Sequence, residues 1–291
     1  MNLSYVAKIK AKVAIFISKK SSNIFDGTYK SIYKGSGLNF EDLREYVPGD
    51  NVRDIDWKAS SRSRNLLVKR YIAEKKHNVM LVFDTGKEID GQTSTHDSKK
   101  DVLTTVGGTI GYIAARNGDN VGALWNRNGK LQFFGLKGGL NNLERILACY
   151  DREKFDEYES DLDKSLNYLC KYFRRRMIVI VMTDIAGTLK ISETTMRRIT
   201  QQHDLLFAQA TDASITDKDA FSIRVGSYIP EFIASSKRIK KCEEKIRQEI
   251  REENERKLKR SHVVSVEIGS DEEVVDKVIE LLEKHKYAYK S

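Results

Sequence analysis

The stretch that decides the fold is Asn78-Val79-Met80-Leu81-Val82-Phe83-Asp84, in which five consecutive apolar residues end in an acid. A strand with one wet face alternates apolar and polar residues, whereas a strand that is buried on both faces is continuously apolar. This run therefore predicts a central strand of a parallel sheet, with Asp84 at its carboxyl end. Residues 177–182 repeat the pattern and lead into Thr183 and Asp184.

Helical and strand-like segments alternate from this run to the end of the chain. After Asp84, apolar residues recur at helical spacing in residues 97–116, and Asn128-Gly129 is typical of a hairpin turn. Alternation of this kind predicts a doubly wound, mostly parallel α/β sheet, whose ligands bind beyond the carboxyl ends of the strands. We expect further helices over residues 140–150, 162–173, 193–202, 235–260 and 272–286, and further strands over residues 121–125, 131–134, 205–209 and 263–268.

The beginning of the chain has a different composition. Residues 1–76 are rich in Gly, Asp, Arg and aromatic side chains and contain short strand-like runs. We therefore expect two parts: an N-terminal β-rich segment over residues 1–76, and an α/β domain over residues 77–291 that includes a long charged helix near residues 235–260.

Positive charge is concentrated in that helix. The chain has a net charge of +9, and residues 237–260 hold 11 Lys and Arg against 6 Glu. Such a helix is usually solvated, and a basic surface suits acidic partners such as nucleic acid, anionic lipid or an acidic protein face. The helix carries a narrow apolar stripe that consists of Ile239, Cys242, Ile246 and Ile250.

The cysteines and the hydropathy pattern indicate the compartment. The three cysteines are far apart and form no Cys-x-x-Cys pair, so neither a zinc site nor a disulfide framework is predicted. No apolar run approaches the roughly 20 residues that span a bilayer. We expect reduced thiols, a cytoplasmic location and no transmembrane segment; a weak amphipathic membrane contact through residues 1–20 is an open alternative.

Oxygen-bearing side chains follow the first buried strand. Asp84 and Glu88 lie four residues apart, and Asp184 ends a second buried strand. Because Mg²⁺ prefers oxygen ligands in octahedral geometry, these three residues are a candidate metal site, with Mg²⁺ as the candidate cofactor. The alternative is a metal-free edge at which the aspartates cap the following helices.

Residues 43–58 form a second dense cluster of charged and aromatic residues. Pro48 and Gly49 favour a turn, because proline presets φ and glycine permits a positive φ. Acids and arginines alternate on both sides of this turn, so bidentate pairs can pin the segment to a neighbour, and Trp57 is a natural apolar anchor. The candidate residues of this cluster, for partner binding or for structure, are Arg44, Glu45, Tyr46, Asp50, Arg53, Asp56, Trp57 and Lys58.

This cluster closely resembles the signature of the family called domain of unknown function 58. The resemblance covers roughly residues 20–210. The matching positions are Leu43 to Tyr46, Pro48 to Asp50, Arg53, Ile55 to Lys58, Ser60, Arg62, Val68 to Tyr71 and Glu74.

The resemblance implies a fold like that of von Willebrand factor type A domains, preceded by a small β-rich segment. It also implies a protein partner, an AAA+ ATPase of the MoxR type. In type A domains, the acid-ended strand begins the metal-ion-dependent adhesion motif Asp-x-Ser-x-Ser. Gly86 and Glu88 stand here at the two serine positions, so the resemblance implies a degenerate site.

We therefore expect a non-enzymatic, protein-binding adaptor or scaffold with a chaperone-like or assembly role. The five histidines are scattered, and no Walker loop or Gly-x-Ser-x-Gly motif is present. One alternative is a metal-dependent nuclease built on Asp50, Asp56 and Lys58, in which carboxylates hold Mg²⁺ and a lysine positions water. A basic nucleic-acid-binding protein is the other alternative, although nucleic acid is not the partner we expect.

Overall fold

The order of the secondary-structure elements follows from a computed structural model. It describes residues 4–19, 42–49, 52, 55–63, 65–70, 76–127, 129–155, 161–216, 221–222, 227–230 and 235–288. The elements are α1 (Tyr5–Lys19), β1 (Asp42–Glu45), α3 (Trp57–Ser60), β2 (Leu67–Arg70), β3 (Asn78–Phe83), η3 (Lys87–Asp90), α4 (Lys99–Arg116), β4 (Asn120–Arg127), β5 (Lys130–Lys137), α5 (Leu140–Asp151), α6 (Leu162–Tyr172), β6 (Ile178–Asp184), α7 (Ile185–Lys190), α8 (Glu193–Gln202), β7 (Asp204–Ala210), β8 (Phe221–Ser222), β9 (Ser227–Tyr228), α10 (Lys237–Arg260), β10 (Val264–Ile268) and α11 (Val274–Ala288).

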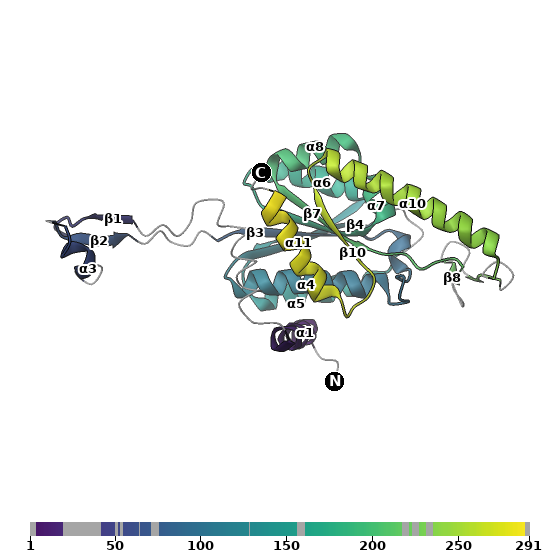
Figure 1. The fold of residues 1–291 in the computed structure, drawn as a ribbon, viewed down its shortest axis with the longest axis horizontal. Helices are drawn as coiled ribbons and strands as arrows, with labels where there is room; N and C mark the ends of the chain where they lie inside the picture. The colour runs from purple at the N-terminus through teal and green to yellow at the C-terminus, as the bar shows by residue number, and fades with distance from the viewer. Residues whose placement is uncertain are drawn as a thin grey trace.

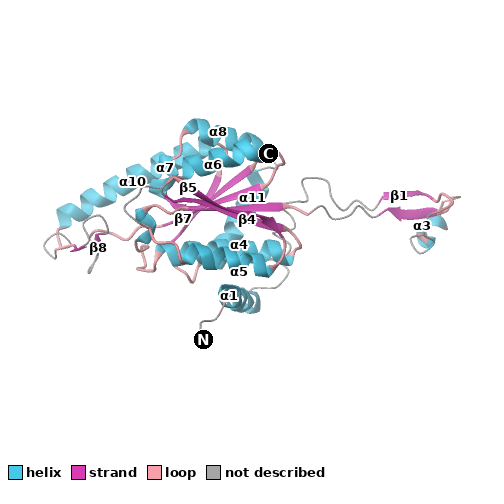
Figure 2. Ribbon diagram, turned by 180° about the vertical axis from the view of Figure 1, so that it is seen from behind, coloured by secondary structure: helices cyan, strands magenta, loops and turns pink. Residues whose placement is uncertain are grey.

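A six-stranded sheet forms the centre of the main domain (Figure 1). Its strand order is β10-β7-β6-β3-β4-β5, and every neighbouring pair is parallel except β4 and β5, which form an antiparallel hairpin at one edge. Helices cover both faces (Figure 2). The predicted fold class, a doubly wound and mostly parallel sheet preceded by a small β-rich segment, is confirmed.

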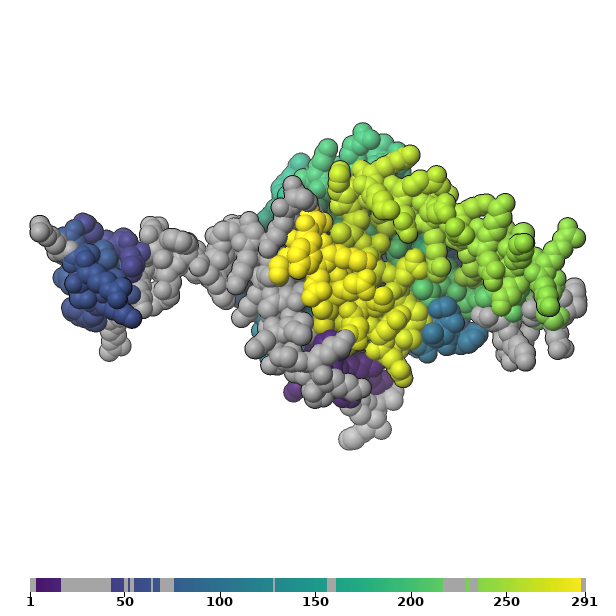
Figure 3. Space-filling model, viewed as in Figure 1, coloured from purple at the N-terminus to yellow at the C-terminus, as the bar shows by residue number. Residues whose placement is uncertain are grey.

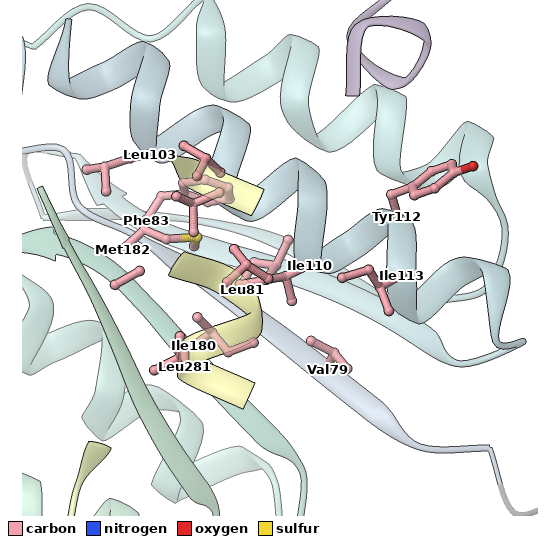
Figure 4. Close-up of a cluster of buried hydrophobic side chains, with 14 of the residues drawn as sticks. Val79, Leu81, Phe83, Leu103, Ile110, Tyr112, Ile113, Ile180, Met182 and Leu281 are labelled. Atoms are coloured by element: carbon pink, nitrogen blue, oxygen red, sulfur yellow. The ribbon is translucent and has the colours of Figure 1, made fainter. Parts of the chain in front are cut away.

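The continuous apolar run of β3 is explained by burial on both faces. Val79, Leu81 and Phe83 point into the core beneath α4, α5 and α11, whereas Met80 and Val82 point into the core beneath α6 and α8. Figure 4 shows the first of these cores, in which side chains of β3 meet those of α4 and α11. Strand β6 is also buried at every position, so both acid-ended strands lie in the middle of the sheet.

Helix α4 packs closely on β3 because Gly107 faces the sheet. A Cβ atom at this position would lie 2.6 Å from Cζ of Phe83. The Phe83 ring cannot easily move, since it stacks on Tyr150 with ring centroids 4.2 Å apart and meets the edge of Trp125. The short helix-to-sheet distance therefore depends on the missing side chain.

Helix α1 belongs to the main domain, although it comes first in the chain. Its buried residues Ile9 and Val13 join the core beneath α4, α5 and α11. The carboxylate of Glu144 in α5 accepts from the backbone N–H groups of Tyr5 and Val6, which lie at the start of α1. The predicted β-rich segment over residues 1–76 thus begins with a helix, and its described strands are confined to residues 42–70.

Those strands form a small separate unit. β1 and β2 pair antiparallel, Ile55 forms a bridge to Val68, and α3 packs beside β2. The unit stands apart from the main domain in Figures 1 and 3. Ile55 and Val68 are its buried apolar residues among those described, so its own core is minimal.

The long helix α10 projects beyond the sheet (Figure 1), and its apolar stripe does not form its buried face. Of the predicted stripe, Cys242, Ile246 and Ile250 are exposed rather than buried. The buried face carries Glu243, Asn254 and Leu258. Polar docking of this kind leaves no apolar periodicity in the sequence, so the stripe does not mark the buried face.

Hydrogen bonds hold α10 in place. Glu243 accepts from the backbone N–H of Ile215 at 2.9 Å and from the hydroxyl of Ser214 at 2.7 Å. Nearer the end of the helix, the ammonium group of Lys257 donates to the carbonyl oxygens of Thr188 at 3.0 Å, Leu189 at 2.7 Å and Ile191. Lys257 therefore caps the carboxyl end of α7, where the helix dipole favours a cation.

All three cysteines are free thiols: Cys149 is partly buried, Cys170 is buried and Cys242 is exposed. None of the described helices combines the length and the apolar character that crossing a bilayer requires.

Candidate functional site

Three aspartates meet at the carboxyl edge of the sheet. Asp84 follows β3, Asp184 ends β6, and Asp212 lies two residues beyond the end of β7. Because these strands are adjacent and parallel, their carboxyl ends lie along one edge, where doubly wound folds place their ligands. Asp84 and Asp184 are 2% and 1% exposed.

Lys99, the first residue of α4, neutralises part of this charge. Its ammonium group lies 2.9 Å from Oδ2 of Asp184, forms an ion pair with Asp212, and donates to the carbonyl oxygen of Glu88 at 3.2 Å. Burial lowers the pKa of Lys99, but the carboxylates of Asp184 and Asp212 outweigh burial and raise that pKa above its ordinary value. Lys99 is therefore a buried, charged ammonium group.

Asp84 is held by donors from its own loop and from β6. Its Oδ1 atom accepts from the backbone N–H of Gly86 at 2.9 Å, and its Oδ2 atom accepts from the hydroxyl of Thr183. Its carbonyl oxygen accepts from the hydroxyl of Tyr150 at 2.8 Å. Burial, with a smaller contribution from the Asp84 charge, raises the pKa of Tyr150 well above its ordinary value, so this phenol remains a donor.

The start of α7 fills the space between the two strand-end carboxylates. Oδ1 of Asp184 accepts from the backbone N–H of Gly187 at 2.7 Å. A Cβ atom on Gly187 would lie 2.6 Å from Oδ2 of Asp84 and 3.4 Å from Oδ1 of Asp184, and it would overlap the hydroxyl of Thr183. Only glycine allows α7 to start this close to both acids.

The donor set does not fit a metal ion of the adhesion-motif kind. Glu88, the third predicted ligand, is 3.8 Å from the ammonium group of Lys190, and its backbone carbonyl is used by Lys99. In the part of the chain that the structure describes, no group of three or more His, Cys, Asp or Glu side chains could hold a metal ion. The structure thus brings Asp84 and Asp184 to one edge, as expected, but does not assemble them with Glu88.

Sequence reasoning missed three members of this site: Lys99, Gly187 and Asp212. For Asp212 a signal existed, since it follows a predicted buried strand just as Asp84 and Asp184 do. Lys99 carries no such signal, because a lysine in the first turn of a helix is ordinarily solvated.

In the small N-terminal unit, polar residues of the signature hold the backbone. Asp56 caps α3, and its Oδ1 atom accepts from the N–H groups of Lys58 and Ala59 at 3.0 Å each. Glu45 accepts from the side-chain amide of Asn65, and Ser60 accepts from the N–H of Leu67 at 2.8 Å. Asp56, whose carboxylate the nuclease alternative would assign to a metal, thus has a structural role as the cap of α3.

Apolar residues of the same unit face outward. Trp57 is 64% exposed, and Val52, Val47, Leu66 and Leu43 are 58%, 56%, 45% and 41% exposed. Large apolar side chains are thus exposed in this unit, while polar side chains brace its backbone. Lys58 is exposed and Tyr46 is partly buried, whereas the predicted residues Asp50 and Arg53 lie outside the described residues.

Solved structures resemble this chain at very low sequence identity. The proximal thread matrix protein 1 (PTMP1) from the mussel byssus is 10% identical, with a TM-score of 0.42, over 72% of this chain and 47% of that protein. The SpRpn10 VWA domain is 11% identical, with a TM-score of 0.36, over 69% of this chain and 95% of that domain.

Sequence relatives have names that state no activity. The uncharacterized proteins Mb1516 of Mycobacterium bovis and Rv1480 of Mycobacterium tuberculosis are each 23% identical to this chain over 199 residues. The match covers 67% of this chain and 62% of each relative, so the chain spans less than two thirds of their length. The family described as Protein of unknown function DUF58 matches residues 42–262, from β1 to the turn after α10. Since this match includes most of the chain, the protein belongs to the DUF58 family.

Proposed function

We propose that the protein is a non-enzymatic protein-binding adaptor or scaffold, which acts with an AAA+ ATPase of the MoxR type in a chaperone-like or assembly role. The observation that carries the proposal is that five large apolar residues of the small unit are exposed. Together they are called here the signature surface: Leu43, Val47, Val52, Trp57 and Leu66.

The small unit is poorly suited to stability on its own. A two-stranded antiparallel pair is at best marginally stable in water, and this one has two buried apolar side chains among its described residues. Single exposed apolar residues are ordinary on a solvated surface, but five large ones on so small a unit are unusual. Covering them with a partner would bury apolar area and stabilise the unit.

Trp57 is the expected centre of the contact. It lies in the first turn of α3, and the Asp56 cap fixes the position of that turn. Tryptophan is enriched among the residues that dominate binding energy, where truncation costs at least about 2 kcal/mol, or roughly 30-fold in affinity. The choice of a MoxR-type ATPase as partner comes from the resemblance to the family.

The test is a binding measurement between the whole chain and the MoxR-type ATPase encoded in the same genome, by biolayer interferometry with ATP, with ADP and without nucleotide. We expect Trp57→Ser to weaken binding by roughly 30-fold. The matched control is Tyr287→Ser, which removes an aromatic residue of 65% exposure from α11 and should leave affinity unchanged. Absence of binding in every nucleotide state would refute the partner, and equal affinities of Trp57→Ser and the native protein would refute the surface.

A further inference from the structure

We infer that Lys99 is the resident cation of the strand-end site, so that an ammonium group of the chain itself takes the role that a divalent metal would have there. The inference concerns the carboxyl edge of the main sheet and does not depend on the proposed partner.

The first argument is that the strand-end carboxylates already have donors. Their four oxygens accept from the N–H of Gly86, the hydroxyl of Thr183, the N–H of Gly187 and the ammonium group of Lys99. Two of these donors are backbone groups at fixed positions, which cannot turn away as a side chain can. A Mg²⁺ ion requires about six oxygens at 2.0–2.1 Å in octahedral geometry, so at this edge it would have to share each carboxylate oxygen with a donor that already binds it.

The second argument is that the positive charge is deeply buried. The side chains of Lys99 and Asp184 are 3% and 2% exposed, and their charged atoms are 2.9 Å apart. A buried ammonium group is costly unless it is paired and hydrogen-bonded, and Lys99 contacts two carboxylates and the carbonyl oxygen of Glu88. A divalent ion beside it would meet a fixed like charge in a poorly solvated place.

The third argument is the balance of charge around Asp212, the second carboxylate that pairs with Lys99. The Asp212 side chain is 46% exposed and pairs with Lys99. Its own carbonyl oxygen accepts from Arg247 of α10 at 3.0 Å, and Arg247 also donates to the carbonyl oxygen of Ala213. The loop that carries Asp212 is therefore held between two basic residues of the chain, Lys99 on the sheet side and Arg247 on the α10 side.

Lys99 joins three segments that are distant in the sequence. It is the first residue of α4, it donates to the carbonyl oxygen of Glu88 in η3, and it pairs with Asp184 at the end of β6 and with Asp212 after β7. In a metal-dependent site of this type an ion would make such links reversibly. Here the cation is a side chain of the protein itself. The segments at this edge should therefore be held together in the same way whether or not divalent cations are present.

The experiment combines Mn²⁺ titration with thermal unfolding of the full chain. The native protein should leave the electron paramagnetic resonance signal of free Mn²⁺ unchanged up to about 1 mM, and neither Mn²⁺ nor a chelator should move its Tm. Lys99→Ala should lower Tm by about 10 °C, because one partner of a buried ion pair is removed. Either Mn²⁺ or the second change Asp184→Asn should restore most of this loss.

The control is Lys190→Ala, which removes a half-exposed lysine at the same edge and should neither lower Tm appreciably nor create Mn²⁺ binding. Stoichiometric Mn²⁺ binding by the native protein, abolished by Asp184→Asn, would overturn the inference. It is also overturned if Lys99→Ala is as stable as the native protein, or if neither Mn²⁺ nor Asp184→Asn restores the lost stability. Should Lys99→Ala not fold, folding of the Lys99→Ala/Asp184→Asn double variant supports the inference, and its failure to fold counts against it.

Discussion

Two buried histidines should make the main domain sensitive to mild acid. His203, which precedes β7, is 0% exposed, and His285 of α11 is 4% exposed. Burial lowers the pKa of both rings; the charge of Asp204 opposes this shift and that of Arg176 adds to it. Both rings are therefore neutral in the native protein at pH values at which an unfolded histidine is protonated.

The sign of the effect follows from proton uptake. An unfolded histidine has a pKa of about 6.5, so below that pH the unfolded chain binds protons that the native chain does not. Stability is then fully present above about pH 6.5 and falls as the pH drops toward the lowered native pKa values. Between about pH 7.5 and pH 5.5 the loss is at most about 1.4 kcal/mol for each ring, or about 2.7 kcal/mol for both. Against a typical total of about 5–15 kcal/mol, this is measurable.

Urea unfolding at several pH values provides the assay, with Trp125 fluorescence as the signal. The chain has two tryptophans, and Trp57→Phe leaves only the core residue Trp125 as a reporter. We expect His203→Asn to remove about half of the decline in unfolding free energy between about pH 7.5 and pH 5.5. The matched control, His96→Asn, changes an exposed histidine and should leave the decline intact. Parallel curves for the His203→Asn variant and its parent would refute the reasoning.

Three further changes test single contacts. Lys257→Met removes the donor to three carbonyl oxygens at the end of α7, so it should lower the unfolding free energy by about 2–3 kcal/mol. Urea unfolding measures this loss, and a loss below about 0.5 kcal/mol would show that the cap is unimportant. Gly107→Ala gains about 1 kcal/mol of helix propensity but forces a methyl group against Phe83, at a cost of about 1–3 kcal/mol. We expect net destabilisation in the same assay, and a more stable variant would contradict the packing argument. Asp56→Ala should cost the small unit about 1 kcal/mol and speed hydrogen exchange of the Lys58 and Ala59 amides, with Asp56→Asn as the conservative control; unchanged exchange would exclude the capping role.

Burial on both faces of a strand is visible in a sequence, and this made the fold predictable. β3 and β6 are continuously apolar because alternate side chains enter different cores, and the acid that ends each run marks the carboxyl edge. Since both strands are parallel neighbours, Asp84 and Asp184 were correctly placed at the same edge. That Glu88 joins them as a metal ligand stays a prediction. Among the described residues, no group of three or more His, Cys, Asp or Glu side chains could hold a metal ion.

Features that depend on loop paths or on polar docking could not be predicted. Lys99 reaches Asp184 because residues 85–98 return the chain to the sheet edge, and no local pattern encodes that return. The buried face of α10 carries Glu243 and Asn254 beside Leu258, so the apolar stripe of the helix does not mark it. Helix α1 contributes Ile9 and Val13 to the main core, and two residues at helical spacing are too few to reveal a docked helix.

The docking of α1 has a mechanical consequence for the signature surface. Because α1 precedes the small unit and β3 follows it, the unit lies on a stretch of chain that is fastened to the main domain at both ends. A force that pulls on the unit would act on both attachments, α1 and β3. β3 pairs with a parallel strand on each side, whereas α1 is held by side-chain packing, by the Glu144 contact at its start and by the ion pair between Lys12 and Asp271. Under load, α1 should detach first, and the unit would then gain reach while the sheet remained intact.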